Sequence, residues 1–331
     1  MNVQFFERKP FNGQISIEKL FSVIRSQLND FGVQTNSFKN PYALKGMLKS
    51  FWYFYKNQGD INHITGDIHW VALVLNPKRT VLTIHDLVGL QYLKGIRKKI
   101  YYYLWIYWPI RRLKYITVIS EKTKKEIVEL LPWAAQKIVV IPNCLTIPFS
   151  KDFKKNNNSI SKFLIIGTRA NKNVDRAIQA LKGIKGVLNI VGEITPEQKV
   201  FLETNNIDYD IHVNVNETKL IEFYKESDIL LFPSFYEGFG LPIIEAQAYQ
   251  CAVITSNISP MKEVAGEGAI LVNPYQINEI TEAIVKLQND TVFKEELIKK
   301  GLMNVKNYEP KAIAILYLNL YQKILQENDF N

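Results

Sequence analysis

Apolar runs of four residues alternate with longer amphipathic segments through the first half of the chain. Residues 81–84 (VLTI) and 116–119 (ITVI) are β-branched runs typical of buried strands. Residues 16–28 and 121–131 have the apolar spacing of helices. This alternation of strand and helix predicts a parallel sheet with helices on its faces.

The same alternation begins again after residue 161 and continues almost to the end of the chain. The expected strands are 163–166, 188–191, 229–232 and 252–255, and the expected helices are 174–181, 219–227 and 242–249. A final helix is expected over 310–325, where apolar residues recur at helical spacing: Ile313, Leu316, Tyr317, Leu320 and Ile324. Two successive α/β domains follow from this pattern.

A polar stretch with three consecutive asparagines separates the two halves. Residues 151–161 (KDFKKNNNSIS) have the composition of a linker or an exposed loop. We therefore expect one domain over residues 1–150 and a second over residues 162–331. A length of 331 residues with 47% apolar residues allows each domain to bury a core of its own.

Composition adds expectations about location and redox chemistry. The sequence has no signal-peptide pattern and no uncharged apolar run of about 20 residues, so we expect a cytoplasmic protein. Cys144 and Cys251 lack the spacing of metal ligands and are expected to be buried thiols.

The charge is distributed unevenly between the two halves. Residues 1–150 contain 21 Lys and Arg against 9 Asp and Glu, a balance of +12. The remainder contains 20 against 23, a balance of −3. The first domain is therefore expected to face something anionic: phospholipid headgroups, a phosphate-bearing substrate or nucleic acid.

The strongest chemical signal is a glycine-rich turn between a strand and a helix, in residues 232–245 (FPSFYEGFGLPIIE). Ligands of parallel α/β sheets bind beyond the carboxyl ends of the strands, where a following helix offers unpaired N–H groups to an anion. Gly238 and Gly240 allow positive φ angles and a close approach of a ligand to the backbone. Glu237 and Glu245 flank the turn and can accept hydrogen bonds from two sets of sugar hydroxyls.

Residues 237–246 (EGFGLPIIEA), with two glutamates separated by seven residues, resemble the signature of the family 4 retaining glycosyltransferases. Other segments resemble the family in its own order: 118–121 with Lys124, 139–143, 166–169 with Lys172 and Asn173, and 263–266. The resemblance covers most of the chain. It implies the GT-B fold, in which two Rossmann-like parallel-sheet domains face a central cleft and the last helix can return to the first domain.

By this resemblance the second domain would hold a nucleoside diphosphate sugar as the sugar donor. Glu245 would bind the ribose hydroxyls and Glu237 the hydroxyls of the donor sugar. The backbone of the turn would contact the sugar and phosphates through Gly238, Phe239, Gly240 and Leu241.

Arg169 and Lys172 would neutralise the diphosphate in the same comparison. The leaving nucleoside diphosphate gains negative charge as the glycosidic bond breaks, so fixed cations stabilise the transition state more than the ground state. We therefore expect neither a metal nor another cofactor, because the nucleotide sugar is a substrate.

Two other patterns have the outline of metal sites. Asp208 and Asp210 form an Asp-x-Asp, but they occupy a polar stretch before an edge-like strand, remote from the glycine-rich turn, and chance explains them better. His63 and His69 lack the spacing of paired helical ligands. We expect no metal at either place.

In the first domain, His85 and Asp86 directly follow an expected strand, within residues 83–87 (TIHDL). They resemble the family's His-Asp pair, which implies that His85 bonds a hydroxyl of the donor sugar and Asp86 binds acceptor hydroxyls. The alternative is a capping pair at a strand end. The loop 10–16 (PFNGQIS) occupies the place where family members carry glycines beside both substrates, and here it retains Gly13.

Residues 94–114 combine seven Lys and Arg with no acidic residue around the aromatic run 101–108 (YYYLWIYW). Such a segment can lie in an anionic membrane interface, within reach of a lipid-linked acceptor. It can equally form a partly buried helix whose aromatic rings pack against the first sheet. No recognition motif accompanies the charge, so nucleic acid is not an expected partner.

The sequence therefore predicts a hexosyl-type transfer with retention, from a nucleoside diphosphate sugar to a saccharide or lipid-linked saccharide. The expected product is an envelope polysaccharide such as capsule or lipopolysaccharide, made at the inner face of the cell membrane. The alternatives are a nucleotide-sugar epimerase or phosphorylase of the same fold, and a non-catalytic protein that binds membranes or polyanions. An oxidoreductase is disfavoured because no Gly-x-Gly-x-x-Gly follows the first strand.

Overall fold

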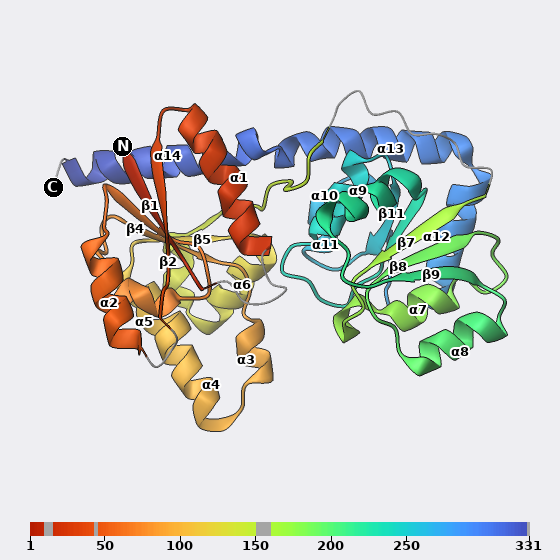
Figure 1. Cartoon of the computed structure of the whole chain (residues 1–331), viewed down its shortest axis with the longest axis horizontal. Coiled ribbons are helices and arrows are strands. Elements are labelled where there is room, and N and C mark those ends of the chain that lie inside the picture. Colours follow the sequence, from red (N-terminus) through yellow and green to blue (C-terminus); the bar gives the residue numbers. More distant parts are fainter. Residues whose placement is uncertain (10–15, 43–45, 150–159, 330–331) are drawn as a thin grey trace. The chain divides into compact units, whose positions relative to one another are not determined.

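The computed structural model describes residues 1–9, 16–42, 46–149 and 160–329, and it divides into two compact units (Figure 1). The first unit comprises Met1–Thr146 and Glu309–Asn331, and the second comprises Ile147–Tyr308. Each is built around a six-stranded sheet whose neighbouring strands are parallel. The predicted α/β class with two parallel-sheet domains is confirmed.

The first sheet has the strand order β2-β1-β3-β4-β5-β6. Its strands are β1 (Asn2–Glu7), β2 (Gln34–Lys39), β3 (Ile61–Ile64), β4 (Thr80–Ile84), β5 (Tyr115–Val118) and β6 (Ile138–Val140). The chain runs from β1 to β2 at one edge and then adds β3 on the other side of β1. Every residue of β3, β4 and β5 is buried, because these inner strands are covered on both faces.

The helices of the first unit are α1 (Ser16–Asp30), α2 (Met47–Lys56), α3 (Val88–Tyr92), α4 (Gly95–Tyr101), α5 (Trp108–Arg112), α6 (Glu121–Leu130) and α14 (Pro310–Asp329). Short 3-10 segments form η2 (His69–Leu73) and η4 (Pro132–Lys137), and a π-helical segment forms η3 (Tyr102–Tyr107). α1 buries Leu20, Phe21, Ile24 and Leu28 along one side, as its apolar spacing predicts.

The second sheet has the order β12-β11-β10-β7-β8-β9. Its strands are β7 (Lys162–Ile166), β8 (Val187–Val191), β9 (Asp208–His212), β10 (Ile229–Phe232), β11 (Ala252–Ser256) and β12 (Ala269–Val272). Its helices are α7 (Val174–Gln179), α8 (Pro196–Thr204), α9 (Glu217–Glu226), α10 (Leu241–Ala248), α11 (Met261–Ala265), α12 (Ile277–Asn289) and α13 (Thr291–Val305), with short segments η5 (Ala170–Lys172) and η6 (Lys306–Tyr308).

The predicted strands and helices of the second half agree with these elements to within a few residues. One local prediction was wrong: Asp208 and Asp210 lie inside the edge strand β9 rather than before it. Cys144 and Cys251 are buried, as expected. Among the helices of the described residues, none combines the length and the apolar character needed to span a bilayer.

The last helix corrects the predicted domain ranges. The range 162–331 assigned α14 to the second domain, whereas Glu309–Asn331 groups with the first unit. Ile313, Tyr317, Leu320, Tyr321 and Ile324 are buried in one cluster with α1 and β1, which explains the grouping. The return of this helix to the first domain is thereby confirmed. Of the predicted linker 151–161, residues 151–159 lie outside the described part of the chain.

A buried polar network ties α14 to the first sheet. His63 on β3 is fully buried, and its ring nitrogens lie 2.6 Å from the Tyr321 hydroxyl and 2.7 Å from the Thr83 hydroxyl. Thr83 in turn lies 2.6 Å from the hydroxyl of Thr117. Burial lowers the pKa of His63 to about 3, so the ring is neutral at ordinary pH. His63 is therefore a core residue of the first unit.

We expect the stability of the first unit to fall with acidification because of His63. The unfolded histidine takes up a proton near pH 6.5, but the buried ring does so only near pH 3. Its contribution is complete above pH 6.5 and declines between these values by up to about 1.4 kcal/mol per pH unit. His63→Gln should be less stable at neutral pH, by about 1–3 kcal/mol, and should have a shallower pH dependence.

All five tryptophans lie in the first unit, so tryptophan fluorescence in urea titrations reports its unfolding. His212→Gln in the second unit is the matched control and should leave this transition unchanged. An unaltered slope between pH 6.5 and pH 5 in His63→Gln would contradict the assignment.

Candidate functional site

The candidate site of the second unit lies where the chain reverses direction across the sheet. β7 is followed by β8 and β9 on one side, and β10 then pairs with β7 on the other side. The loops that leave the carboxyl ends of β7 and β10 therefore diverge, which is the usual position of a ligand in an open α/β sheet. Arg169 and Lys172 follow β7, and Glu237 follows β10.

The loop after β7 turns through two residues with positive φ. Gly167 has a φ of 79°, and a side chain there would lie 3.1 Å from Cε of Lys172. The glycine therefore lets Lys172 fold back across the loop. Asn173 has a φ of 57°, a conformation that asparagine tolerates better than most residues, and α7 begins directly after it.

Two asparagine side chains join the loops after β7 and β10. The amide of Asn173 donates to the carbonyls of Pro233, at 2.9 Å, and Pro274, at 2.7 Å, in a buried setting. The amide of Asn171 donates to the Tyr236 carbonyl at 2.8 Å. The backbone N–H of Phe235 returns a bond of 2.8 Å to the Asn171 carbonyl. The two loops therefore form one connected structure.

This structure brings two predicted site residues into direct contact. Nζ of Lys172 lies 2.8 Å from Oε1 of Glu237, and both side chains are mostly buried, with exposed fractions of 17% and 13%. The same ammonium lies 4.4 Å from the centre of the Phe232 ring, and the Asn171 amide donates to Glu237 at 3.3 Å. The carboxylate thus neutralises the lysine in the absence of another anion.

Arg169 has a different environment from Lys172. Its side chain is exposed, and its guanidinium makes no hydrogen bond or ion pair with any residue in the described ranges. The site therefore combines one cation paired to a carboxylate with one cation that faces solvent. Such a combination can accept an anion without removing a buried charge from its partner first.

The glycine-rich turn has the predicted form at Gly240. This residue has a φ of 110°, and a side chain on it would lie 3.1 Å from Cδ1 of Ile243. α10 begins at Leu241 with Pro242 in its first turn, where a missing N–H costs no helical hydrogen bond. Phe239 is buried and lies edge-on to Tyr308.

Glu245 lies one turn into α10 and is 6% exposed. Its Oε2 accepts a hydrogen bond of 2.7 Å from the hydroxyl of Tyr224 on α9. Burial and the neighbouring charge of Glu245 raise the pKa of Tyr224, so the phenol remains a hydrogen-bond donor. Tyr224 thus orients the carboxylate from the side of α9.

In the first unit, His85 has a defined tautomer. Its Nε2 lies 3.0 Å from the carbonyl oxygen of Thr65, which can only accept, so Nε2 carries the proton and Nδ1 is an acceptor. Burial lowers the pKa of His85 to about 4 despite this bond and the charge of Asp86. The ring is therefore a neutral hydrogen-bond acceptor at ordinary pH.

Asp86 contacts the backbone that leads into α3. Its Oδ1 accepts a bond of 2.9 Å from the backbone N–H of Val88, at the start of α3. Asp67, which the sequence did not single out, lies close enough to Asp86, His69 and Arg8 for their charges to act on its pKa, which burial raises. Gly13 lies outside the described residues.

Within the described ranges, no three His, Cys, Asp or Glu side chains lie close enough together to hold a metal ion. His69 bonds the carbonyl of Trp105 through Nδ1, at 2.8 Å.

The sequence did not predict the roles of three residues: Asn171, Asn173 and Tyr224. Asn173 stood next to Lys172 in a resembling segment, but its two bonds could not be read from that segment.

Known proteins are similar to the chain in both sequence and fold. A family model described as Glycosyl transferases group 1 matches residues 149–302, and one described as Glycosyltransferase Family 4 matches residues 14–147. The O-antigen chain mannosyltransferase RfbU of Salmonella typhimurium is 28% identical over 216 residues, which are 62% of this chain and 59% of RfbU. The matched region thus spans less than two thirds of that relative.

Two solved structures share the fold at low identity. Sucrose-phosphate synthase from Thermosynechococcus elongatus gives a TM-score of 0.75 at 18% identity, over 98% of this chain and 99% of that one. Alr3699/HepE of Anabaena, in complex with UDP and glucose, gives 0.72 at 14% identity, over 98% and 100%. These similarities establish the architecture.

We expect Asn173→Ala to destabilise the second unit by about 2–4 kcal/mol. The substitution leaves two buried carbonyls without a donor and removes a residue that tolerates positive φ. Hydrogen exchange of peptides from residues 162–308 measures the loss of protection. Asn205→Ala is the matched control, because its amide bonds only a local carbonyl of its own helix, that of Phe201. Equal protection in the two variants would contradict this role.

Proposed function

We propose that this chain is a family 4 glycosyltransferase that transfers a sugar from a nucleoside diphosphate to a saccharide or lipid-linked saccharide. The observation that carries this proposal is the Lys172–Glu237 pair beside an exposed Arg169, at the strand reversal next to the glycine-rich turn. We further propose that the product is an envelope polysaccharide, as the name of RfbU suggests for that relative.

The two cations would bind the diphosphate of the sugar donor. Lys172 would exchange its bond to Glu237 for a phosphate oxygen, while the exposed Arg169 would add a second positive charge. The carboxylate released from Lys172 would then accept hydrogen bonds from the hydroxyls of the donor sugar. Because negative charge grows on the leaving diphosphate, both cations would contribute more in the transition state than in the ground state.

The remaining donor contacts would come from α10 and the turn before it. The backbone of Gly238, Phe239, Gly240 and Leu241 would approach the sugar and phosphates, since the positive φ of Gly240 directs the chain into a helix start. Glu245, oriented by Tyr224, would accept hydrogen bonds from the ribose hydroxyls.

The first unit would contribute His85 and Asp86, together with Gly13. The neutral His85 ring, with its proton on Nε2, would accept a hydrogen bond from a hydroxyl of the donor sugar at Nδ1. Asp86 accepts the backbone N–H of Val88 with one oxygen, and its carboxylate would also bind acceptor hydroxyls.

The transfer is proposed to be of a hexosyl type and to retain the anomeric configuration. The bond between the sugar carbon and the phosphate oxygen would break, and a phosphate oxygen would take the proton of the incoming acceptor hydroxyl as the new glycosidic bond forms. Arg169 and Lys172 would supply the positive charge, so no metal or other cofactor is included in this proposal.

We also propose that the segment 94–114 contacts an anionic membrane, so that the reaction takes place at the inner, cytoplasmic face of the cell membrane. Ile106 and Ile110 of this segment are in the core, whereas α4 has no buried residue. Ile96 and Ile100 are exposed, next to the basic residues 97–99.

We expect Arg169→Ala and Glu237→Ala each to lower kcat/KM by about 10²–10³-fold. The assay offers a panel of nucleotide sugars, including a mannose donor, and measures nucleoside diphosphate release with and without a saccharide acceptor. Lys219 and Glu222 on α9 form an exposed ion pair of 2.9 Å, and Glu222→Ala is the matched control. Release that never requires an acceptor would refute the transferase and favour an epimerase or a phosphorylase.

The membrane contact has a separate test. Ile96→Gln combined with Ile100→Gln should weaken binding to vesicles of phosphatidylglycerol by about tenfold, because two exposed apolar side chains are removed from the interface. Vesicle flotation without nucleotide sugar measures this binding. Unchanged flotation would remove α4 from the proposed contact without affecting the transferase.

A further inference from the structure

The helix α2 has apolar side chains on two opposite sides. Ser50 and Phe54 face the core, where Phe54 is fully buried. Leu48, Trp52 and Tyr55 recur at helical spacing on the other side and are 82%, 61% and 60% exposed. A helix that only covered a sheet would present polar residues to solvent on that side, so the exposed stripe requires its own explanation.

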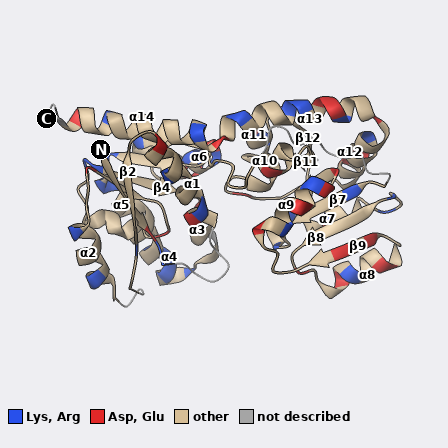
Figure 2. Cartoon of the chain, turned by 45° about the horizontal axis from the view of Figure 1, so that its top comes forward, with Lys and Arg blue, Asp and Glu red and all other residues tan. Residues whose placement is uncertain are grey.

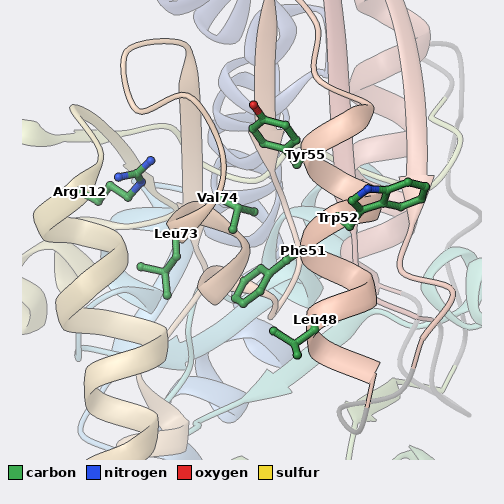
Figure 3. Close-up of a pocket in the computed structure, with 7 residues that line it drawn as sticks. All are labelled: Leu48, Phe51, Trp52, Tyr55, Leu73, Val74 and Arg112. Carbon is green, nitrogen blue, oxygen red and sulfur yellow. The ribbon is translucent and has the colours of Figure 1, made fainter.

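The stripe continues into an open groove of about 490 Å³ (Figure 3). α2 supplies one wall, and Leu73 and Val74 at the end of η2 supply the other. Phe51 lies between them and packs at 5.2 Å against the buried ring of Trp70. The groove is therefore a stable apolar depression, because its walls rest on the core of the first unit.

The charged residues on α2 and in the lining of the groove are all positive. Figure 2 shows basic and no acidic residues on α2, in agreement with its sequence MLKSFWYFYK, whose charged residues are all lysines. Nζ of Lys56 lies 3.9 Å from the ring centre of Trp52. Arg112 lines the groove and is held by bonds of 3.0 Å and 3.2 Å to the carbonyls of Ala72 and Leu75. Exposed apolar side chains next to cations are typical of helices that lie in a membrane interface.

The wider distribution of exposed rings agrees with this interpretation. Six of the seven large aromatic side chains with substantial exposure in the described residues belong to the first unit: Trp52, Tyr55, Tyr92, Tyr103, Trp108 and Trp133. Tyr275 is the one in the second unit. Trp and Tyr prefer the level of lipid headgroups, where the ring contacts acyl chains and the polar edge contacts water.

A second copy of the chain fits this surface less well. In a symmetric pair the same residues meet each other, so Lys49 and Lys56 would face lysines with no carboxylate on α2 to pair with them. An anionic bilayer supplies both the apolar and the negative component that the surface lacks.

We propose that the outer face of α2, with its groove, docks onto an anionic phospholipid bilayer. Leu48 and Trp52 enter the boundary between headgroups and acyl chains, and Lys49 and Lys56 contact the lipid phosphates. Apart from Arg112, this site lies outside the segment 94–114. The proposal does not depend on the proposed transferase activity.

Vesicle flotation of the full chain tests the apolar part of the site. The vesicles contain either phosphatidylcholine alone or an equal mixture of phosphatidylcholine and phosphatidylglycerol. Leu48→Gln combined with Trp52→Gln should weaken binding to the mixed vesicles by about tenfold or more. Val200→Gln combined with Val292→Gln is the matched control, since these side chains are 60% and 70% exposed on the second unit, and it should bind like the original protein.

The charged part is tested by Lys49→Gln combined with Lys56→Gln. Each lysine should contribute about fivefold to binding of mixed vesicles and nothing to binding of phosphatidylcholine. Mixed-vesicle binding of Leu48→Gln/Trp52→Gln equal to that of the original protein would overturn the proposal. The proposal would also be overturned if the original protein sedimented as a dimer and Leu48→Gln/Trp52→Gln as a monomer. That result would assign the surface to a second copy of the chain. Acceptor-dependent turnover with a water-soluble saccharide should be the same in all these variants, so a failed transferase assay leaves the vesicle result interpretable.

Discussion

Each sheet begins with an inner strand, extends to one edge and then continues on the other side of that first strand. Because of this strand order, the loops after β7 and β10 in the second unit leave the sheet in opposite directions, and so do the loops after β1 and β3 in the first. Loops that diverge in this way would be flexible if no contact joined them. In the second unit the amide of Asn173 prevents this, because it satisfies two buried carbonyls on two different loops.

The electrostatics of the candidate site depend on that connection. Once Asn171 and Asn173 hold the loops together, Lys172 and Glu237 are confined to contact, with little water around them. A mostly buried ion pair has a stronger interaction than an exposed one, but it also loses more hydration. In the proposed reaction, an arriving diphosphate would compete for Lys172, with the exposed Arg169 as its first point of attraction.

The first unit uses burial differently. His63 and His85 both have lowered pKa values, but His63 has both nitrogens bonded within the core, whereas Nε2 of His85 bonds a carbonyl and Nδ1 is left as an acceptor. The same unit carries the exposed aromatic and basic surfaces of α2 and α4. On both helices, basic residues accompany the exposed apolar side chains.

The sequence by itself determined the α/β class, the order of most strands and helices, and the glycine-rich turn, because apolar periodicity and glycine conformation are local properties. It also determined which residues follow each strand, and so Arg169, Lys172, Glu237 and His85 could be predicted as site residues. Only the tertiary structure decided that α14 completes the first unit and that Asn173 joins two loops, since these contacts connect residues about 60 to 260 positions apart. It also decided which side of each amphipathic helix faces the core, because a helix with two apolar sides, such as α2, has no periodicity that distinguishes them.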